Sequence, residues 1–187
     1  MPKNTLRKLL LARRKALTVA EVDTASRAIQ ERFLASGEFG TSLILALYAP
    51  ICNEVKTGRV FSAARNAAKT VLYPVVNGES LEFRRVNSPE ELQKGAFGIP
   101  EPLVTCAVIN PRMADFIVIP GVGFDLQGKR IGYGKGFYDK TLHLQEGEGR
   151  FVGFCYDFQL VDEILDEPHD VKLDMIITEK RVVYPRD

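Results

Sequence analysis

Residues 115–139 read DFIVIPGVGFDLQGKRIGYGKGFYD, and six of the chain's fifteen glycines lie between Gly121 and Gly136. Glycine costs backbone entropy on folding, so this concentration indicates a geometric need. The need that we infer is close approach of backbone N–H groups to an anion. The apolar run 115–120 predicts a buried strand, and a helix is predicted over Phe137–Leu144. A strand, a glycine-rich loop and a helix N-terminus are typical of a phosphate cradle.

A purely structural interpretation of these glycines stays open. The loop lacks the Walker A pattern, and Phe137 breaks the dinucleotide-binding fingerprint Gly-x-Gly-x-x-Gly. Residues 125–128 predict an ordinary hairpin connection, which would make the glycines a set of tight turns. Lys135 favours the anion-binding interpretation, because a cation between two glycines has few packing duties. Lys129 and Arg130 add positive charge to the same loop.

Predicted strands and helices alternate along the rest of the chain. The helices are expected over residues 3–16, 18–35 (with a capping box from Thr18 and Glu21) and 57–68, and the strands over 42–48, 70–76, 80–86, 151–155, 174–178 and 181–184. A short helix is predicted from Ser88, followed by an irregular connector over 95–102. This alternation predicts an α/β fold, a three-layer α/β/α Rossmann-like arrangement with a mainly parallel sheet, as a single domain over 1–187.

Ligands in open parallel sheets bind beyond the carboxyl ends of the strands. The loops after Tyr48 and Pro120 are expected to emerge there together.

Composition narrows the function classes. The chain has 187 residues, of which 45% are apolar and 26% charged, as is ordinary for a soluble globular protein. Its net charge of +1 gives no strong field, so we expect no nucleic-acid partner, and no apolar run approaches the length of a membrane span. Cys52, Cys106 and Cys155 are widely spaced and odd in number, which indicates reduced thiols and a cytoplasmic location. We expect a monomer.

Three acidic residues are candidates for chemistry. Asp139 lies at the start of a predicted helix, where it can complement the helix dipole or hold Mg²⁺ beside phosphates, and Asp174 can supply a second carboxylate. Glu54 follows a predicted buried strand. It faces solvent in the plain interpretation, and in the functional one it hydrogen-bonds a polar substrate ring or transfers a proton.

The basic first helix has three interpretations. The plainest is a solvated face with an apolar stripe on the core. An RNA-binding patch is the second, although the helix has no aromatic side chain on which bases can stack. In the third, Lys3 and Arg7, one turn apart, reach the triphosphate of a bound nucleotide.

Taken together, these residues resemble the 5-formyltetrahydrofolate cyclo-ligase family, whose members are also called 5,10-methenyltetrahydrofolate synthetases. The resemblance runs in order over nearly the whole chain, and its most specific part is the loop segment. The matching positions are residues 3–7, 14, 48–50, 53–57, 97–102, 120–125, 130–139, 159, 169–170 and 173–179.

The resemblance implies an ATP- and Mg²⁺-dependent enzyme that converts 5-formyltetrahydrofolate to 5,10-methenyltetrahydrofolate, with release of ADP and phosphate. It implies that ATP phosphorylates the formyl oxygen, after which N10 attacks the activated carbon and closes the ring. Such a transfer depends above all on alignment and charge neutralisation.

It also implies roles for individual residues. The residues implied to bind ATP are Lys3, Asn4, Thr5, Leu6, Arg7, Arg130, Ile131, Gly132, Tyr133, Gly134, Lys135, Gly136, Phe137 and Tyr138. Those implied to bind the folate are Ala49, Glu54, Tyr133, Gly134, Lys135, Gly136 and Phe137. Asp139 and Asp174 are the implied metal ligands, and Lys135, Arg130 and Glu54 the implied catalytic residues.

Two positions depart from the family pattern. Lys56 stands where an acid is common, and Lys140 where Arg is frequent, which loses bidentate geometry. Lys56 keeps open a non-catalytic nucleotide- and folate-binding regulatory protein with the same fold. An RNA-associated module, driven by the basic first helix, is a further alternative.

Overall fold

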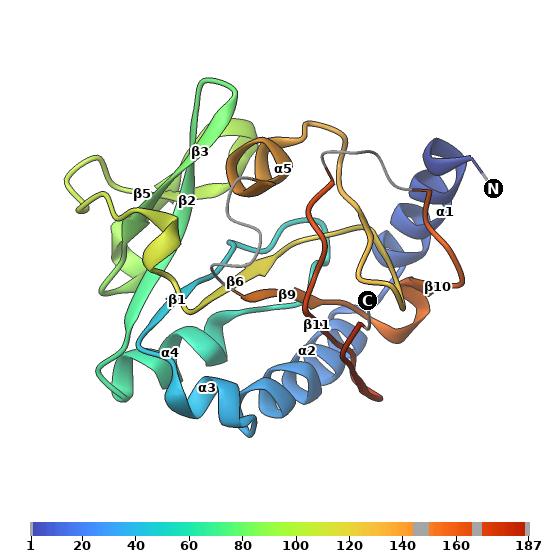
Figure 1. Cartoon of the computed structure of the whole chain (residues 1–187), viewed down its shortest axis with the longest axis horizontal. Coiled ribbons are helices and arrows are strands. Elements are labelled where there is room, and N and C mark those ends of the chain that lie inside the picture. Colours follow the sequence, from blue (N-terminus) through green and yellow to red (C-terminus); the bar gives the residue numbers. More distant parts are fainter. Residues whose placement is uncertain (1, 144–149, 166–169, 186–187) are drawn as a thin grey trace.

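A seven-stranded sheet forms the centre of the computed structural model, which describes residues 2–143, 150–165 and 170–185 (Figure 1). Its strands, in spatial order, are β12 (Val182–Val183), β11 (Met175–Ile177), β9 (Arg150–Phe154), β6 (Phe116–Ile119), β1 (Ile44–Ala46), β2 (Thr70–Asn77) and β3 (Ser80–Arg85). The five strands from β11 to β2 are parallel, and the two edge strands are antiparallel to their neighbours. The prediction of a mainly parallel sheet is confirmed.

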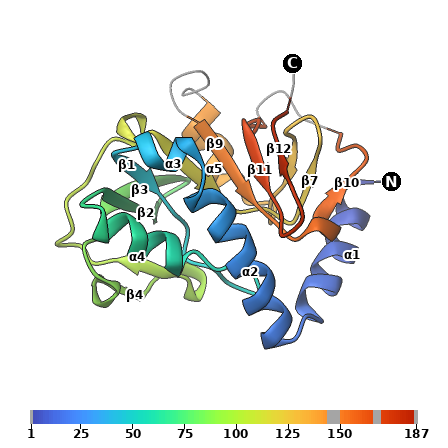
Figure 2. The same cartoon turned by 90° about the horizontal axis from the view of Figure 1, so that it is seen from below.

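Helices α2 (Val19–Leu34), α3 (Gly37–Thr41) and α4 (Gly58–Asn66) cover one face of this sheet (Figure 2). Alternate residues of each strand point to this face, as the period of two in a strand requires. Phe33 of α2 is fully buried, with its ring centroid 6.1 Å from that of Phe116 and 5.4 Å from that of Phe154. Edge-to-face aromatic pairs of this kind add to the gain from apolar burial.

The opposite face carries a mixed layer. It consists of the short helix α5 (Phe137–Leu142) and a three-stranded sheet of β10 (Leu160–Val161), β7 (Gly123–Asp125) and β8 (Arg130–Ile131). Phe124 of β7 packs close over Gly153 of the central sheet, where an added Cβ would lie 2.9 Å from the aromatic ring. The fold therefore has three layers, and its second outer layer is largely β-structure.

The glycine run divides into two parts. Strands β7 and β8 pair antiparallel, and Asp125 closes their connection by accepting hydrogen bonds from the N–H groups of Gln127 and Lys129. The hairpin alternative is thus confirmed for the first half. The loop that leads into α5 begins at Gly132, after β8 and not directly after the buried strand β6. Helix α5 covers six residues, and Leu144 lies outside the described residues.

The predictions for residues 88–102 need correction. Ser88 makes no capping hydrogen bond, and only a 3₁₀ turn, η1 (Pro89–Glu91), forms there. It leads into β4 (Leu92–Lys94), which pairs antiparallel with β5 (Pro100–Pro102). The connector over residues 95–102 was expected to have little regular structure. A two-stranded ribbon leaves one edge of each strand without a ladder partner, and prolines are tolerated there.

Helix α1 (Lys3–Lys15) lies at one end of the molecule beside β10 (Figure 1). Its Leu10 is buried against Val122, Ile131 and Ile164. Shorter 3₁₀ turns are η2 (Ala96–Gly98), η3 (Pro111–Met113) and η5 (Asp157–Gln159). Among the described helices, none has the length and apolar character that crossing a membrane requires.

The strand order creates a switch point. From β1 the chain passes through α4 to β2 on one side, whereas β6 lies on the other side of β1. Because the two connections diverge, a crevice opens beyond the carboxyl ends of β1 and β6, where ligands bind in open α/β sheets.

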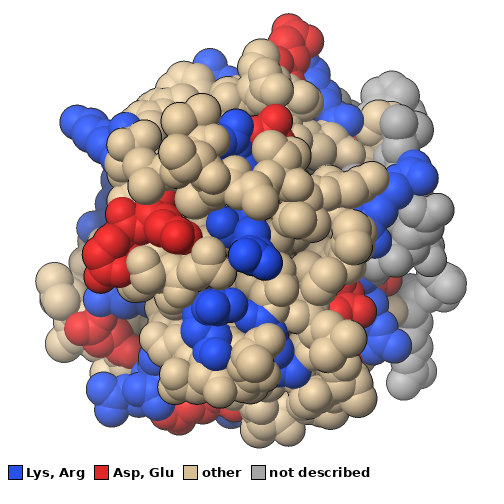
Figure 3. Space-filling model, turned by 90° about the vertical axis from the view of Figure 1, so that its left-hand side faces the viewer, with Lys and Arg blue, Asp and Glu red and all other residues tan. Residues whose placement is uncertain are grey.

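Charged side chains of both signs are mixed on the face beside β3 and β5, where patches of Lys and Arg alternate with patches of Asp and Glu (Figure 3). This mixture agrees with the net charge of +1.

Candidate active site

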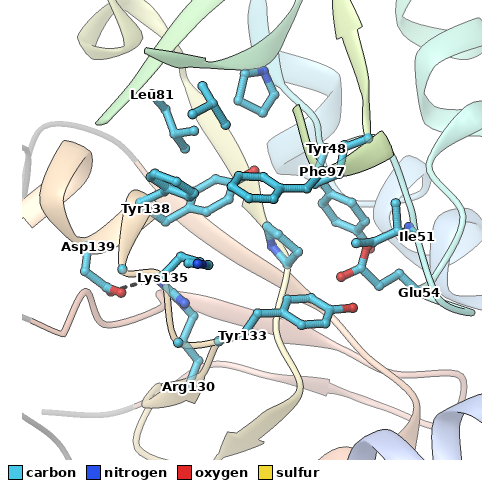
Figure 4. Close-up of a pocket in the computed structure, with 18 of the residues that line it drawn as sticks. Tyr48, Ile51, Glu54, Leu81, Phe97, Arg130, Tyr133, Lys135, Tyr138 and Asp139 are labelled. Carbon is cyan, nitrogen blue, oxygen red and sulfur yellow. Dashed lines mark hydrogen bonds and ion pairs between the residues drawn. The ribbon is translucent and has the colours of Figure 1, made fainter. Parts of the chain in front are cut away.

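A cavity of about 700 Å³ occupies this crevice (Figure 4). Tyr48 and Ala49 after β1 and Pro120 after β6 line its floor, as the expected meeting of these two loops predicts. The other walls come from α1, from the 130–139 segment, and from the β2–β3 hairpin together with the connector around Phe97.

Glu54 projects into the cavity from a tight turn. The Glu54 N–H donates to the Ile51 carbonyl at 2.9 Å, and the Ile51 N–H donates to Glu54 Oε2 at 2.9 Å. Cys52 and Asn53, the central residues of the turn, have φ of 48° and 57°. Left-handed backbone is unfavourable for residues other than glycine and persists where surrounding contacts impose it.

Those contacts come from two directions. The Asn53 Nδ2 group donates to the carbonyls of Arg14 and Leu17 at 3.2 and 3.1 Å, which satisfies acceptors at the C-terminal end of α1. The Tyr156 hydroxyl donates to the Asn53 carbonyl at 2.9 Å. The turn is therefore fastened to α1 and to the loop after β9.

Burial raises the pKa of the Glu54 carboxyl, while the Ile51 N–H, the Arg14 guanidinium and Tyr133 lower it. The Glu54 residue is 5% exposed. Its Oε1 atom is fully buried and has no hydrogen-bond partner among the described residues. A buried acceptor without a donor is costly, so this atom is poised to receive an N–H or O–H group from a ligand.

Arg14 is a residue of this site to which the sequence analysis gave no role. It is 1% exposed, and its guanidinium donates from Nε to the Cys52 carbonyl at 3.1 Å and from Nη1 to the Gly121 carbonyl at 3.0 Å. Its Nη2 donates to the Tyr133 hydroxyl and lies 3.8 Å from Glu54 Oε1. One signal was present in the sequence: positions 3, 7 and 14 fall on one face of a helix.

The glycine loop forms the opposite wall. Gly134 and Gly136 have φ of 97° and 68°, a conformation that glycine adopts without penalty. The N–H groups of Tyr133, Gly134 and Lys135 donate no hydrogen bond to any described residue. The Lys135 ammonium is exposed and lies 5.5 Å from the centroid of the Phe97 ring.

Arg130 and Asp139 form an ion pair at the far end of the cavity from Glu54 (Figure 4). Arg130 is 5% exposed and donates from Nη2 to Asp139 Oδ1 at 2.6 Å, and the Val171 N–H donates to the same oxygen at 3.2 Å. The Arg130 Nε atom is buried and has no acceptor among the described residues. The cavity thus contains one buried acceptor and one buried donor that no described residue satisfies.

Helix α1 contributes its first turn to the cavity wall. Lys3, Asn4 and Arg7 line the cavity; Arg7 Nε donates to the Gly132 carbonyl at 2.8 Å, and Lys3 Nζ pairs with Asp170 at 2.8 Å. The third interpretation of the basic helix stays a prediction, to which the structure adds that both cations line the cavity.

Three residues expected at the ATP site lie outside the cavity lining. Thr5 is exposed on α1, whereas Leu6 and Ile131 pack in the small core around Leu10. The remaining residues expected to bind ATP or folate all line the cavity.

The structure does not bring the two predicted metal ligands together. Asp139 lines the cavity, whereas Asp174 does not, and its carboxylate accepts a hydrogen bond from the Phe151 N–H at 2.7 Å. Within the described ranges, no group of three or more His, Cys, Asp or Glu side chains could hold a metal ion. The Asp174 carboxylate therefore holds the start of β9 by accepting this backbone hydrogen bond.

An apolar wall was missed by the sequence analysis. Pro74, Val76 and Leu81 from the β2–β3 hairpin line the cavity together with Phe97 and Ile99 of the connector. Strand residues that are half-buried in a ligand cavity look like ordinary sheet residues in sequence, so no local signal separates them from the core.

The two departures from the family pattern both lie outside the cavity lining. Lys56 forms a half-exposed ion pair with Asp23 of α2, and Lys140 pairs with Glu79 at 2.9 Å. Neither change alters the polar groups that the cavity presents.

Comparisons with known proteins agree with the geometry. The sequence model described as the 5-formyltetrahydrofolate cyclo-ligase family matches residues 1–179. The 5-formyltetrahydrofolate cyclo-ligase of Mycoplasma genitalium is 33% identical over 178 residues, which cover 94% of this chain and 96% of that protein. The solved structure of 5,10-methenyltetrahydrofolate synthetase from Aquifex aeolicus has a TM-score of 0.88 at 38% identity, covering 100% of this chain and 94% of that one. The Mycoplasma pneumoniae synthetase has a TM-score of 0.78 at 29% identity, covering 96% and 99%.

Proposed function

The chain belongs to the 5-formyltetrahydrofolate cyclo-ligase family, and from this premise we propose that its cavity converts 5-formyltetrahydrofolate to 5,10-methenyltetrahydrofolate with ATP and Mg²⁺. The observation that carries the proposal is the pair of unsatisfied buried atoms, Glu54 Oε1 and Arg130 Nε, at the two ends of one cavity. An acceptor at one end suits an N–H group of the pterin ring, and a donor at the other suits a phosphate oxygen.

Four cations support a triphosphate site beside the glycine loop. Lys3 and Arg7 reach the cavity from α1, and Arg130 and Lys135 reach it from the 130–139 segment. When bound, ATP supplies the terminal phosphoryl group that turns the formyl oxygen into a leaving group. Charge accumulates on the oxygens of that group during transfer, so preorganised cations stabilise the transition state more than the ground state. Lys135 and Arg130 are the cations that we assign to this role.

Ring closure then places demands on the other end of the cavity. N10 forms the new C–N bond to the formyl carbon as the phosphorylated oxygen leaves as inorganic phosphate, and N10 gives up its proton. We assign to Glu54 the orientation of the pterin and formyl region through its unsatisfied Oε1. A carboxylate held by its own turn needs no reorganisation when substrate binds, which favours a near-attack geometry.

For Mg²⁺ we choose Asp139 among the four carboxylate residues that line the cavity, Glu54, Glu101, Asp139 and Asp170, because it was a predicted metal ligand and lies beside Arg130. Mg²⁺ commonly keeps several waters and binds one or two carboxylates together with substrate phosphates, so a single aspartate fits such a site. Bound there, the metal would neutralise phosphate charge. Asp174 is left out of this proposal because its carboxylate lies outside the cavity lining.

The apolar wall supports a flat, partly apolar substrate. Phe97, Ile99 and the β2–β3 residues Val76 and Leu81 offer surfaces on which the pterin and aminobenzoyl rings of a folate can pack. We further propose a cytoplasmic monomer. Free Cys52, Cys106 and Cys155 are compatible with a reducing compartment, and light scattering of the purified chain tests the oligomeric state.

The assay is direct. Purified protein mixed with ATP, Mg²⁺ and 5-formyltetrahydrofolate should raise the near-ultraviolet absorbance of the methenyl product and release ADP in equal amount. Omitting ATP should abolish the signal, and chelation by EDTA followed by Mg²⁺ addition should remove and restore it. Absence of product at any metal concentration contradicts the proposal.

The regulatory alternative makes a different prediction, namely nucleotide and folate binding without ADP release. Lys56, the residue that suggested it, is paired with Asp23 outside the cavity lining. This position supports the catalytic proposal over that alternative.

A further inference from the structure

The buried side of the active site contains a guanidinium that the proposed chemistry does not use. Arg14 lies beneath the cavity and outside its lining, with 1% exposure. Burying an unpaired charge is strongly unfavourable, so its contacts show what it is fixed against. Those contacts join three separate segments: the Glu54 turn through the Cys52 carbonyl, the β6–β7 connection through the Gly121 carbonyl, and the glycine loop through the Tyr133 hydroxyl.

Tyr133 is the residue of the glycine loop that Arg14 contacts. Tyr133 is 40% exposed. It stands between Gly132 and Gly134, and without the contact to Arg14 the backbone around it could adopt many conformations. Its hydroxyl accepts from Arg14 Nη2, and the Arg14 guanidinium lies 5.5 Å from the centre of its ring. Figure 4 shows the hydroxyl directed toward Glu54.

We propose that Arg14 and Tyr133 form a latch that positions the glycine loop relative to the Glu54 carboxylate, so that the phosphate side and the pterin side of the site move as one unit. Arg14 is a positioning residue in this scheme, since it acts through Tyr133 and Glu54. The inference rests on the proposed function for its kinetic consequence. The geometric part, that the latch orders the loop, stands without it.

Helix α1 supplies both contacts that hold the glycine loop. Arg7 of α1 donates to the Gly132 carbonyl, and Arg14, two turns later, donates to the hydroxyl of the next residue, Tyr133, so both contacts hold the start of the loop. The Asn53 side-chain amide donates hydrogen bonds to backbone carbonyls at the C-terminal end of α1. A single rigid element therefore fixes the loop and the Glu54 turn to each other.

The decisive variants are Tyr133→Phe, which removes only the hydroxyl, Arg14→Lys, which keeps the charge but loses the fork of donors, and the double variant. Each single change should lower kcat/KM for 5-formyltetrahydrofolate about tenfold, because a hydrogen bond to a charged group is lost. The double variant should fall little further than the poorer single one, since both changes break one connection. Arg13→Lys is the matched control and should match the wild type, because Arg13 packs over the ring of Phe158 away from the cavity.

A pH profile separates positioning from a merely structural role. The Arg14 charge and a hydrogen bond from Tyr133 lower the pKa of Glu54. The acid limb of kcat/KM should therefore move to higher pH in Tyr133→Phe and stay nearly in place in Arg14→Lys, which keeps the charge. The titratable groups that interact with Glu54 from the surrounding elements are Arg14, Tyr48, Tyr133, Tyr138 and Tyr156. Tyr133→Phe and Arg14→Lys change only members of the proposed latch.

A third measurement does not depend on turnover. NMR order parameters for the backbone of residues 132–135 should be close to 0.85 in the wild type and fall toward about 0.6 in Tyr133→Phe. If the loop is equally ordered in both, the latch does not exist, whatever the kinetics. If Arg14→Lys does not fold, Tyr133→Phe alone decides the matter.

The outcomes are distinguishable. A wild type that produces no methenyl product defeats the proposed function, while the order parameters still judge the latch. An active wild type with fully active Tyr133→Phe and Arg14→Lys variants defeats the latch and leaves the proposed function intact, as do losses that multiply in the double variant.

Discussion

The Glu54 turn and the glycine loop face each other across one cavity, and they are built in opposite ways. The turn ends at the buried Glu54, keeps Cys52 and Asn53 in left-handed backbone, and is held by contacts with α1 and Tyr156. The loop is exposed and uses Gly134 and Gly136 at positive φ, where no strain arises. Several contacts fix the backbone of the Glu54 turn, whereas the backbone of the glycine loop can change conformation at low cost.

The difference has a physical rationale. A carboxylate that must orient a neutral ring gains from being fixed before substrate arrives, because the ordering entropy is then spent during folding. A loop that receives a triphosphate and releases ADP has to open and close, and exposed cations can follow a charge that moves during the reaction. The predictions below test this division of labour.

The largest loss of activity is expected at Glu54, the buried end of the cavity. Glu54→Gln should lower kcat/KM about 10²–10³-fold, or about 3–4 kcal/mol, because a neutral amide cannot replace a preorganised charge. Steady-state kinetics with the methenyl absorbance measure it. The acid limb that Glu54 gives to the wild-type profile should vanish in the variant.

The same substitution should raise stability at neutral pH. Burial raises the pKa of Glu54, so its folded-state proton contributes stability that is present below the unfolded pKa and is lost as pH rises through the folded pKa. Glutamine does not titrate. The Tm of Glu54→Gln should therefore exceed that of the wild type by an amount that grows from about pH 4 toward pH 7. If the Tm difference between the variant and the wild type stayed constant over that pH interval, burial would not raise the pKa of the Glu54 carboxyl.

A smaller kinetic loss is expected at the exposed end. Lys135→Ala should lower kcat about 30–100-fold, or about 2–3 kcal/mol, because one cation is removed from the phosphoryl-transfer site. Tm should be unchanged, since the side chain is exposed and lies between two flexible glycines. A loss of Tm comparable to that of a core substitution would contradict the contrast between the two regions. Lys140→Ala, outside the cavity, is the control.

Strain in the Glu54 turn can be measured through Asn53. Asn53→Ala should cost about 2–3 kcal/mol in the free energy of unfolding, since it loses the amide hydrogen bonds to α1 and leaves a Cβ residue at φ 57°. Asn53→Gly loses the same hydrogen bonds without the conformational penalty, so it should be about 1 kcal/mol less costly. Urea denaturation of both variants provides the comparison, and equal costs would mean that the backbone conformation carries no strain.

The smallest effect is expected at Lys56. Lys56→Ala should change stability by less than about 0.5 kcal/mol and leave kcat/KM within about twofold, because a half-exposed ion pair contributes little. Thermal denaturation and the standard assay check both. A large gain in activity would revive the idea that Lys56 disables the site.

Much of this organisation was readable from local patterns. The capping box at Thr18 and Glu21 fixed the start of α2, and the apolar run 115–120 correctly predicted β6. The glycine concentration correctly pointed to the segment that lines the cavity with Lys135. These features depend on residues near each other in sequence, so local propensity and spacing are sufficient to find them.

Other features depend on contacts between distant segments. Asp139 and Asp174 were paired as metal ligands on their residue type, and the structure places only Asp139 in the cavity. The ribbon of β4 and β5 was missed because prolines and a proline-led turn argue locally against strands. Arg14 belonged to the family resemblance but had no assigned role, because its contacts with Gly121 and Tyr133 join segments that lie far apart in the sequence.

From residue types and their spacing alone came the α/β architecture, the family resemblance and the segments that carry most of the cavity. Folding in three dimensions added which atoms lack a partner among the described residues: Glu54 Oε1 and Arg130 Nε are unsatisfied there because burial removes water from them while their neighbours bond elsewhere. Burial of an individual atom is a property of the packed chain and is not encoded at any single position, which is why the alignment of groups across the cavity could not be read from the sequence.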